Sequence, residues 1–525
     1  MQKINVADFI EHNKTHIFSE DQKKCIDDIF TFFSDGRKAI GFYGFAGTGK
    51  TTTIIKILMY IITKQHMTNI ACTALTNKAV NILKSKFMTE FDNITPGTSF
   101  HDTIMRLAFD GMCLDFITTH KLLGVARDFN VDGSVVFRLS NKCSIDKYQL
   151  VIIDECSMIS NDILKEITSQ IDKHNTKVIF IGDPGQLPPV NESISKLFSD
   201  KTITSMTMKN IVRSNYSSII NLSNEVRAWI FNEIKIPILG KFRGPNVLMY
   251  KYNSSNGSKT KTEWFTRFIE QTAHHNTLNT IILTWTNKQT DEYNNIARSV
   301  INKTSELNKY EIGDILILST FYNLKEDHDE KENKFYTSEQ VRIKGVDIVN
   351  KVLNKFVENV MQTAPLSPGI KTKYISTVRA INKKINREYK CHKLIVSKLN
   401  DQEQCQNIYI LDEHTQKDHQ MTLNKIIADI HKMIEYYELH YKNDMGLIEL
   451  HIIKNFWSEF NKNYIDQFAN VNYGYSTTVH KSQSSTYQNV FIDMDDIIKN
   501  KNENDMKRCL YTAVTRASER LYILI

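Results

Sequence analysis

The stretch Gly44-Phe-Ala-Gly-Thr-Gly-Lys50-Thr51 matches the phosphate-binding pattern G-x-x-x-x-G-K-[ST] at every fixed position. The apolar run 39–43 before it predicts a buried strand, and the pattern over 52–64 predicts a helix. A glycine-rich loop between a strand and a helix directs backbone N–H groups and a helix N-terminus at one anion. The alternative is a glycine-rich turn that binds nothing. The context favours a nucleoside triphosphate site, in which Lys50 reaches the β- and γ-phosphates and the Thr51 hydroxyl holds Mg²⁺.

Length and composition indicate a large intracellular protein. The 525 residues are enough for three or four domains, and the net charge of +7 permits a nucleic-acid partner without requiring one. None of the eight cysteines forms a C-x-x-C pair, so we expect free thiols and no zinc site. The first residues lack the apolar core of a signal peptide, and the most apolar helix, 54–62, is too short to span a bilayer. We therefore expect a soluble, cytoplasmic protein without a membrane partner.

The order of the predicted elements indicates an α/β fold with two interruptions. Strand and helix patterns alternate over 1–95, are lost over 96–143, and return with strands at 148–153 and 177–181. A second α/β pattern follows residue 200, with a helix at 217–231, a strand at 280–284 and a helix at 288–302. Residues 305–472 lack steady alternation, and their short strand-like pieces suggest a small β domain. The last 55 residues return to α/β.

Two acids end the predicted strand at 148–153. Asp154 is placed to hold magnesium through water, and Glu155 to orient the attacking water. The alternative is an acidic pair that caps a helix starting near Ser157. The phosphate-binding loop upstream favours the catalytic interpretation.

Two further segments carry groups that can reach a γ-phosphate. Gln186 lies in the turn 182–189, directly after the strand 177–181. Arg516 lies in a short apolar run near the end of a predicted helix, as an arginine finger from a second domain would. Their alternatives are an ordinary strand-ending turn and a surface arginine.

Ten segments occur in an order that has a known counterpart. They are 18–22 (FSEDQ), 44–51, 73–79 (TALTNKA), 98–101 (TSFH), 151–158 (VIIDECSM), 182–186 (GDPGQ), 208–215 (MKNIVRSN), 284–288 (TWTNK), 477–483 (TTVHKSQ) and 511–516 (YTAVTR). This ordered set resembles superfamily 1 DNA helicases, in particular the group B enzymes of the bacteriophage Dda type, with RecD- and Pif-type relatives. The resemblance covers nearly the whole chain and is weakest across 320–470.

The resemblance implies an α/β fold with two RecA-like P-loop motor domains, each interrupted by an insertion. The implied parts are a first RecA-like domain (1–95 and 144–200), a fork-contacting insertion (96–143), a second RecA-like domain (201–304 and 473–525) and an inserted small β-barrel with extra helices (305–472).

The resemblance also implies roles for residues at matching positions. The ATP ligands would be Gln22, Gly47, Thr48, Gly49, Lys50, Thr51 and Thr52, with Gln22 reading adenine. Thr51 and Asp154 would hold Mg²⁺, and the catalytic set would be Lys50, Asp154, Glu155, Gln186, Arg213 and Arg516. The strand channel would be lined by Thr73, Asn77, Lys78, Phe100, His101, Thr478 and His480.

One position departs from the family pattern H-[KR]-[SA]-Q-G, because Gln483 is followed by Ser484. If the glycine of that pattern takes a positive φ, serine costs roughly 1 kcal/mol there. We expect looser coupling between ATP and the strand rather than an inactive enzyme, since the nucleotide motifs are intact.

The resemblance predicts an ATP-dependent DNA helicase that moves 5′ to 3′ on single-stranded DNA in replication, recombination or repair. Its partners would be single-stranded DNA, forked duplex DNA and a single-strand-binding protein or replisome component. Two alternatives remain: a nucleic-acid clamp with weak or structural use of ATP, which Ser484 supports, and an RNA motor. A RecD-like nuclease subunit is not favoured, because no acid-rich nuclease block is present.

Overall fold

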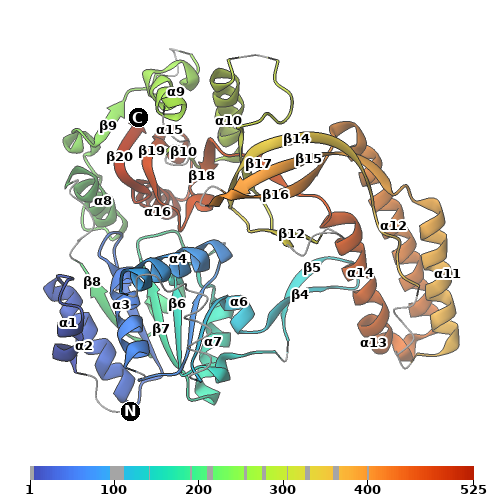
Figure 1. The fold of residues 1–525 in the computed structure, drawn as a ribbon, viewed down its shortest axis with the longest axis horizontal. Coiled ribbons are helices and arrows are strands. Elements are labelled where there is room, and N and C mark those ends of the chain that lie inside the picture. Colours follow the sequence, from blue (N-terminus) through green and yellow to red (C-terminus); the bar gives the residue numbers. More distant parts are fainter. Residues whose placement is uncertain are drawn as a thin grey trace. The chain divides into compact units, whose positions relative to one another are not determined.

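The computed structural model describes most of the chain (Figure 1). The described residues are 5–64, 66–94, 111–140, 142–189, 192–209, 217–253, 257–274, 280–303, 306–325, 332–358, 366–398 and 401–525. They divide into two compact units, of which the first holds 1–124, 140–305 and 475–525 and the second holds 125–139 and 306–474. No helix in these ranges is long and apolar enough to cross a membrane.

The first unit contains two parallel sheets, and the one nearer the N-terminus carries the phosphate-binding loop. In spatial order its strands are β3 (Cys113–Thr118), β2 (Asn69–Ala74), β6 (Leu150–Asp154), β7 (Lys177–Gly182), β1 (Ala39–Gly44) and β8 (Thr204–Met208). Its helices are α1 (Val6–His12), α2 (Glu20–Ser34), α3 (Lys50–Thr63), α4 (Asn77–Ile94), α6 (Thr119–Leu122) and α7 (Asn161–Lys173). The central strands are apolar almost throughout, as strands covered on both faces must be. We call this part the first lobe.

The second parallel sheet of this unit forms the second lobe. Its strands are β18 (Ser476–Thr478), β10 (Thr280–Thr284), β19 (Tyr487–Asp493), β20 (Ala517–Leu524) and β9 (Val247–Tyr250). Its helices are α8 (Ser217–Ile230), α9 (Glu263–His274), α10 (Asn287–Ile301), α15 (Met494–Ile497) and α16 (Glu503–Val514). Helices α8 and α16 pack together over one apolar core that includes Leu222, Val226 and Leu510. The expected fold class, α/β with two P-loop-type lobes, is confirmed.

The second unit is built on antiparallel strands and long helices. Its main sheet runs β16 (Asp401–Leu411), β15 (Glu388–Lys398), β14 (Gln340–Val352), β11 (Ile315–Leu318) and β17 (Val471–Tyr473). Its other elements are the strand pair β12 (Tyr322–Lys325) and β13 (Glu332–Phe335), and the helices α11 (Pro368–Lys384), α12 (Glu413–His440), α13 (Met445–Ile448) and α14 (Lys454–Phe460). Within the described ranges β16 and β17 are the two edges of an open sheet, so the small β-barrel expected here is not confirmed.

The hairpin of β4 (Val125–Phe129) and β5 (Val135–Leu139) packs in the second unit, although the chain around it builds the first lobe. Phe129 belongs to the core formed by α11, α12 and α14. The Trp457 Nε1–H donates to the Val131 carbonyl at 3.0 Å. Lys454 pairs with Asp128 at 2.9 Å, and Arg127 pairs with Asp466 at 2.8 Å. The turn end of the hairpin is therefore fixed by both packing and charge.

Two strands lie outside the expected limits of the first lobe. β3 falls within 96–143, the stretch expected to be an insertion, yet it pairs in parallel with β2 as an edge strand. β8 lies beyond residue 200 and pairs in parallel with β1. Within the described part of that stretch, the hairpin is the part that leaves the lobe.

Candidate active site

The phosphate-binding loop has the geometry of an open anion cradle. Gly47 and Gly49 have φ values of 83° and 84°, which only glycine adopts without strain. Helix α3 begins at Lys50 without a side-chain cap, so its first N–H groups remain available to a phosphate. The Lys50 ammonium donates to the carbonyls of Gly44 (2.6 Å) and Phe45 (3.0 Å), which hold it over the loop. Thr48 is buried, whereas Thr51 and Thr52 are half-buried in the first turn of α3.

Gln22 is tied to this loop. Its side chain closes a capping box at the start of α2 by accepting from the Ser19 N–H at 2.9 Å, and its amide donates to the Thr48 carbonyl at 3.2 Å. A Cβ at Gly49 would lie 2.6 Å from the Gln22 amide nitrogen. The predicted adenine-reading residue therefore also braces the loop, and the glycine keeps room for it.

Asp154 and Glu155 lie where β6 ends, at the same edge of the sheet as the loop after β1. The Glu155 N–H donates to the Asp154 carboxylate at 2.8 Å, and Glu155 has a left-handed backbone with φ 53°. Burial and the neighbouring Glu155 carboxylate raise the pKa of Asp154 to about 6, against the opposing charges of Lys86 and Lys50. Helix α7 instead begins at Asn161, with Ser160 as its N-cap. A 3-10 turn at Cys156–Met158 does have Glu155 at its N-cap position, but no side chain caps it by a hydrogen bond. The helix-cap interpretation therefore has only positional support.

These oxygens fit a magnesium ion. Mg²⁺ needs only one or two protein oxygens when phosphate oxygens and water complete its octahedron. The Thr51 hydroxyl and the Asp154 carboxylate are of that kind, and a nearby cation would relieve the cost of burying an ionised Asp154. No group of three or more His, Cys, Asp or Glu suited to a metal occurs in the described ranges, so a phosphate-free metal site is not supported.

The turn after β7 joins the first lobe to α16 of the second. Asp183 accepts from the Gly185 N–H at 2.9 Å and from the Tyr511 hydroxyl at 2.9 Å. Arg508, one helical turn before Tyr511, donates to the carbonyls of Pro184 and Gln186. Gln186 is buried in this turn, and its side-chain oxygen has no hydrogen-bond partner within the described ranges.

Arg516 is buried inside the second lobe, with 5% of its surface exposed. Its guanidinium donates to the Thr512 carbonyl (3.0 Å), to the Ser485 carbonyl (3.1 Å) and to the Thr515 hydroxyl (3.1 Å). The surface-arginine alternative is therefore wrong. To act as a finger, Arg516 has to exchange some of these bonds for phosphate.

Ser484 has φ 63°, the left-handed conformation that was the condition for strain at this position. The carbonyl of the next residue, Ser485, is the one that accepts from Arg516. The Gln483 amide reaches across to the Leu187 carbonyl at 3.4 Å. The segment therefore connects the second-lobe arginine with the turn that carries Gln186.

The predicted strand contacts differ in how accessible they are. Asn77 and Lys78 are half-buried at the start of α4, and His480 is exposed after β18. Thr73 is fully buried, and its hydroxyl donates to the Ile152 carbonyl at 3.0 Å. Thr478 is also buried, within β18. Three predicted residues, Phe100, His101 and Arg213, lie outside the described residues.

Two contacts at the site were missed by sequence reasoning. The Arg227 guanidinium of α8 lies 3.9 Å from the centre of the Phe45 ring in the phosphate-binding loop. Asp496 accepts from the backbone N–H groups of Trp285 and Thr286, both at 2.8 Å, and so holds the TWTNK segment. An acid at the start of α15 and an arginine on an amphipathic helix give no local signal, because their partners are distant in sequence.

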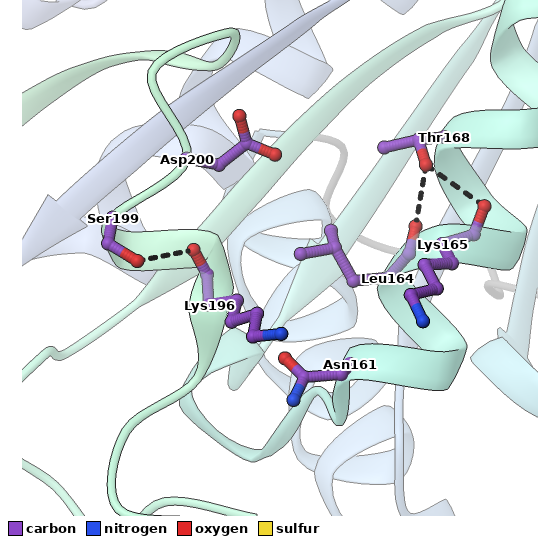
Figure 2. Close-up of a pocket in the computed structure, with 7 residues that line it drawn as sticks. All are labelled: Asn161, Leu164, Lys165, Thr168, Lys196, Ser199 and Asp200. Atoms are coloured by element: carbon purple, nitrogen blue, oxygen red, sulfur yellow. Dashed lines mark hydrogen bonds between the residues drawn. The ribbon is translucent and has the colours of Figure 1, made fainter.

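A separate cavity lies on the first lobe, away from these groups (Figure 2). Its volume is about 300 Å³, and it is lined by Asn161, Leu164, Lys165, Thr168, Lys196, Ser199 and Asp200. None of the predicted site residues lines it. The Thr168 hydroxyl donates to the Leu164 and Lys165 carbonyls, and the Ser199 hydroxyl donates to the Lys196 carbonyl.

Two protein-family models match the chain. An AAA domain covers residues 18–229 and a UvrD-like helicase C-terminal domain covers residues 473–524. Uncharacterized protein R530 of Acanthamoeba polyphaga mimivirus is 31% identical over 527 residues, covering 97% of this chain and all of that protein. RecBCD enzyme subunit RecD of Buchnera aphidicola subsp. Schizaphis graminum is 26% identical over 504 residues, covering 91% of this chain and 69% of that protein.

Among solved structures, Pif1 helicases align with this chain over most of its length. One from Bacteroides, in complex with ADP-AlF3 and ssDNA, covers 97% of this chain and 92% of its own, with 13% identity and a TM-score of 0.44. One from Candida albicans covers 97% and 95%, with 16% identity and a TM-score of 0.38.

The loop after β1, the acids after β6 and the turn after β7 define a P-loop ATPase with two RecA-like lobes. The ordered motifs, the two matched domains and the full-length relatives narrow this class. The chain belongs to the superfamily 1 helicases and is an ATP-driven helicase.

Proposed function

We propose that this protein is a DNA helicase whose ATP hydrolysis is stimulated by single-stranded DNA, along which it moves from 5′ to 3′. The observation that carries the proposal is the meeting of both lobes at the nucleotide loops. Tyr511 of the second lobe contacts Ala46 and Asp183 of the first. A motor needs such a contact, because closure of the lobes must depend on the γ-phosphate.

In this proposal the first lobe binds the nucleotide. Lys50 and the N–H groups of 47–52 hold the phosphates. Thr51 and Asp154 would hold Mg²⁺, which would supply positive charge against the developing phosphate charge. Glu155 orients the water. Gln186, Arg213 and Arg516 respond to the γ-phosphate, and Gln22 contacts adenine.

The strand is held by backbone contacts and stacking. Asn77, Lys78 and His480 contact phosphate and sugar, Phe100 and His101 stack on bases, and Thr73 and Thr478 shape the path from behind. Such a channel is tolerant of sequence. The solved Pif1 structures with ssDNA and forked dsDNA support strand and fork DNA as the substrates.

The hairpin of β4 and β5 is the proposed fork contact of the insertion 96–143. Val135, Phe137 and Leu139 alternate along β5 and are exposed by 44%, 69% and 52%. Apolar side chains in a row on a braced hairpin suit stacking against the first base pair of a duplex. The second unit holds the turn end of that hairpin in place.

The deciding experiment compares ATP turnover with and without DNA, and unwinding of duplexes with 5′ or 3′ tails. We expect DNA-stimulated turnover and unwinding of the 5′-tailed duplex. Lys50→Ala should abolish turnover and leave strand binding largely intact, while Glu155→Gln should bind ATP and hydrolyse it very slowly. A wild-type protein that binds DNA but hydrolyses ATP at the same low rate with and without it would favour the clamp. A preference for RNA would favour the RNA motor.

A further inference from the structure

Tyr511 is a buried polar group between the two lobes. Its side chain is 1% exposed, and it lies on the face of α16 that also presents Arg508, one turn earlier. Burial and the nearby Asp183 carboxylate raise its pKa far above the ordinary value, so the phenol keeps its proton. A neutral hydroxyl can donate one hydrogen bond and accept others.

Both kinds of hydrogen bond go to nucleotide-binding segments of the first lobe. The hydroxyl donates to Asp183 Oδ2 at 2.9 Å and accepts from the Ala46 N–H at 3.3 Å. Ala46 lies in the phosphate-binding loop, and Asp183 begins the turn that carries Gln186. One atom of the second lobe thus joins two loops of the first lobe.

Several hydrogen bonds hold the turn in position at this contact. Asp183 Oδ1 is bonded to the Gly185 N–H, and Arg508 donates to the carbonyls on either side of Gly185. A Cβ at Gly185 would lie 3.0 Å from the Tyr511 ring. A shift of the phosphate-binding loop at Ala46 therefore has to move either the Tyr511 hydroxyl or the turn.

We propose that Tyr511 is a positioning residue that transmits the state of the phosphate-binding loop to Gln186, by exchanging its Ala46 hydrogen bond when the γ-phosphate enters. The inference rests on the proposed function and deepens it. The phenol touches no reacting atom in this arrangement. It sets where the γ-phosphate-facing amide of Gln186 lies relative to Lys50.

Tyr511→Phe tests the proposal, because it removes the hydroxyl and keeps the ring. Tyr522→Phe is the matched control. Tyr522 is a buried tyrosine of the same lobe that stacks on Phe491 with ring centres 4.1 Å apart, and no described group bonds its hydroxyl. Two quantities are measured for each protein: kcat and KM for ATP with saturating DNA, and the ratio of affinities for ADP–aluminium fluoride and for ADP without DNA.

We expect Tyr511→Phe to lower kcat by about tenfold or more, the factor that corresponds to one lost hydrogen bond to a charged group, with a much smaller change in KM. The affinity ratio should fall by a similar factor, and Tyr522→Phe should match the wild type. Gly185→Ala, which presses on the ring while keeping the hydroxyl, should shift the same ratio in the same direction.

Either of two results would overturn the inference. One is an affinity ratio and kcat for Tyr511→Phe within about twofold of the wild type, less than one such bond accounts for. The other is an equal loss of ADP and ADP–aluminium fluoride affinity, which would mean that the phenol only supports the fold. The affinity ratio needs no DNA, so it remains informative if the wild type proves not to be DNA-stimulated.

Discussion

Ser484 has a left-handed backbone conformation, which is unfavourable for a residue with an L side chain. The carbonyl of its neighbour Ser485 accepts a hydrogen bond from the buried Arg516. Residues kept in the left-handed region at roughly 1–2 kcal/mol each are often found where geometry serves function. Glu155, with φ 53°, is a second such residue at the same site. Both are polar residues at positions where glycine would be unstrained.

Ser484→Gly should keep or raise DNA-stimulated ATP turnover, and should raise unwinding per ATP more than DNA affinity. The reason is that glycine removes the strain on the segment between β18 and Arg516. Unwinding amplitude and ATP consumed are measured together for both proteins. Asn232→Gly, at another left-handed residue with φ 58°, is the matched control and should leave both unchanged. A marked loss of both quantities in Ser484→Gly would identify the serine as an adaptation.

Asp154→Asn should make the metal-free protein more stable at pH 8 while it destroys ATP turnover. The pKa of Asp154 is raised in the folded state, to about 6, so the ionised form costs stability above that pH. The cost disappears below the unfolded-state pKa near 3.9. Asparagine should therefore raise the free energy of unfolding by about 1–3 kcal/mol at pH 8 and leave it unchanged near pH 4. Denaturant unfolding with a chelator at both pH values measures this, and a less stable variant at pH 8 would restore the helix-cap interpretation.

Elements near the nucleotide were largely predictable, because each is a short apolar strand that ends in a motif. β1, β6, β7 and β10 all lie where apolar runs rich in Ile, Leu, Val and Phe predict them. β3 was missed, since an edge strand with one partner needs little apolar sequence. Glu155 and Ser484 show what could not be predicted about the site. Their positions were identified from the sequence, but a positive φ depends on the surrounding fold.

Helix α12 was missed although its signal was present. Its buried residues recur at intervals of three and four along 28 residues, and they include Leu423, Ile426, Ile430, Met433 and Tyr437. The charged residues between them gave that stretch the appearance of a polar, irregular segment. A count of matches to the helical period would have identified it.

Phe137→Ala should reduce unwinding several-fold and leave DNA-stimulated ATP turnover near the wild-type value. Loss of an aromatic stacking surface is worth about 1–3 kcal/mol per base. Because Phe137 is 69% exposed on a hairpin anchored at its turn end, its truncation should not disturb the fold. Ile348→Ala, at an exposed apolar residue of β14 in the same unit, is the control. Equal unwinding by the wild type and Phe137→Ala would remove the hairpin from the fork.

For the whole molecule, strand binding should weaken with salt and be indifferent to base sequence. The net charge is +7, and a strand bound through phosphate releases counterions. Lys78→Ala should reduce the slope of log affinity against log salt by about 1. Lys165→Ala, an exposed lysine beside the separate cavity, should leave the slope unchanged. Fluorescence anisotropy on mixed-sequence oligonucleotides decides this, and a flat salt response would count against a strand channel.

The hairpin of β4 and β5 also has a consequence for how the chain is made. Its anchoring partner Trp457 follows Val131 by 326 residues. At a translation rate of about 5–20 residues per second, that partner leaves the ribosome roughly 15–65 s after the hairpin. During this interval Phe129 and the apolar row of β5 have no core to join. The nascent chain therefore exposes an apolar hairpin for most of its synthesis. We expect a chaperone to bind the chain during this time.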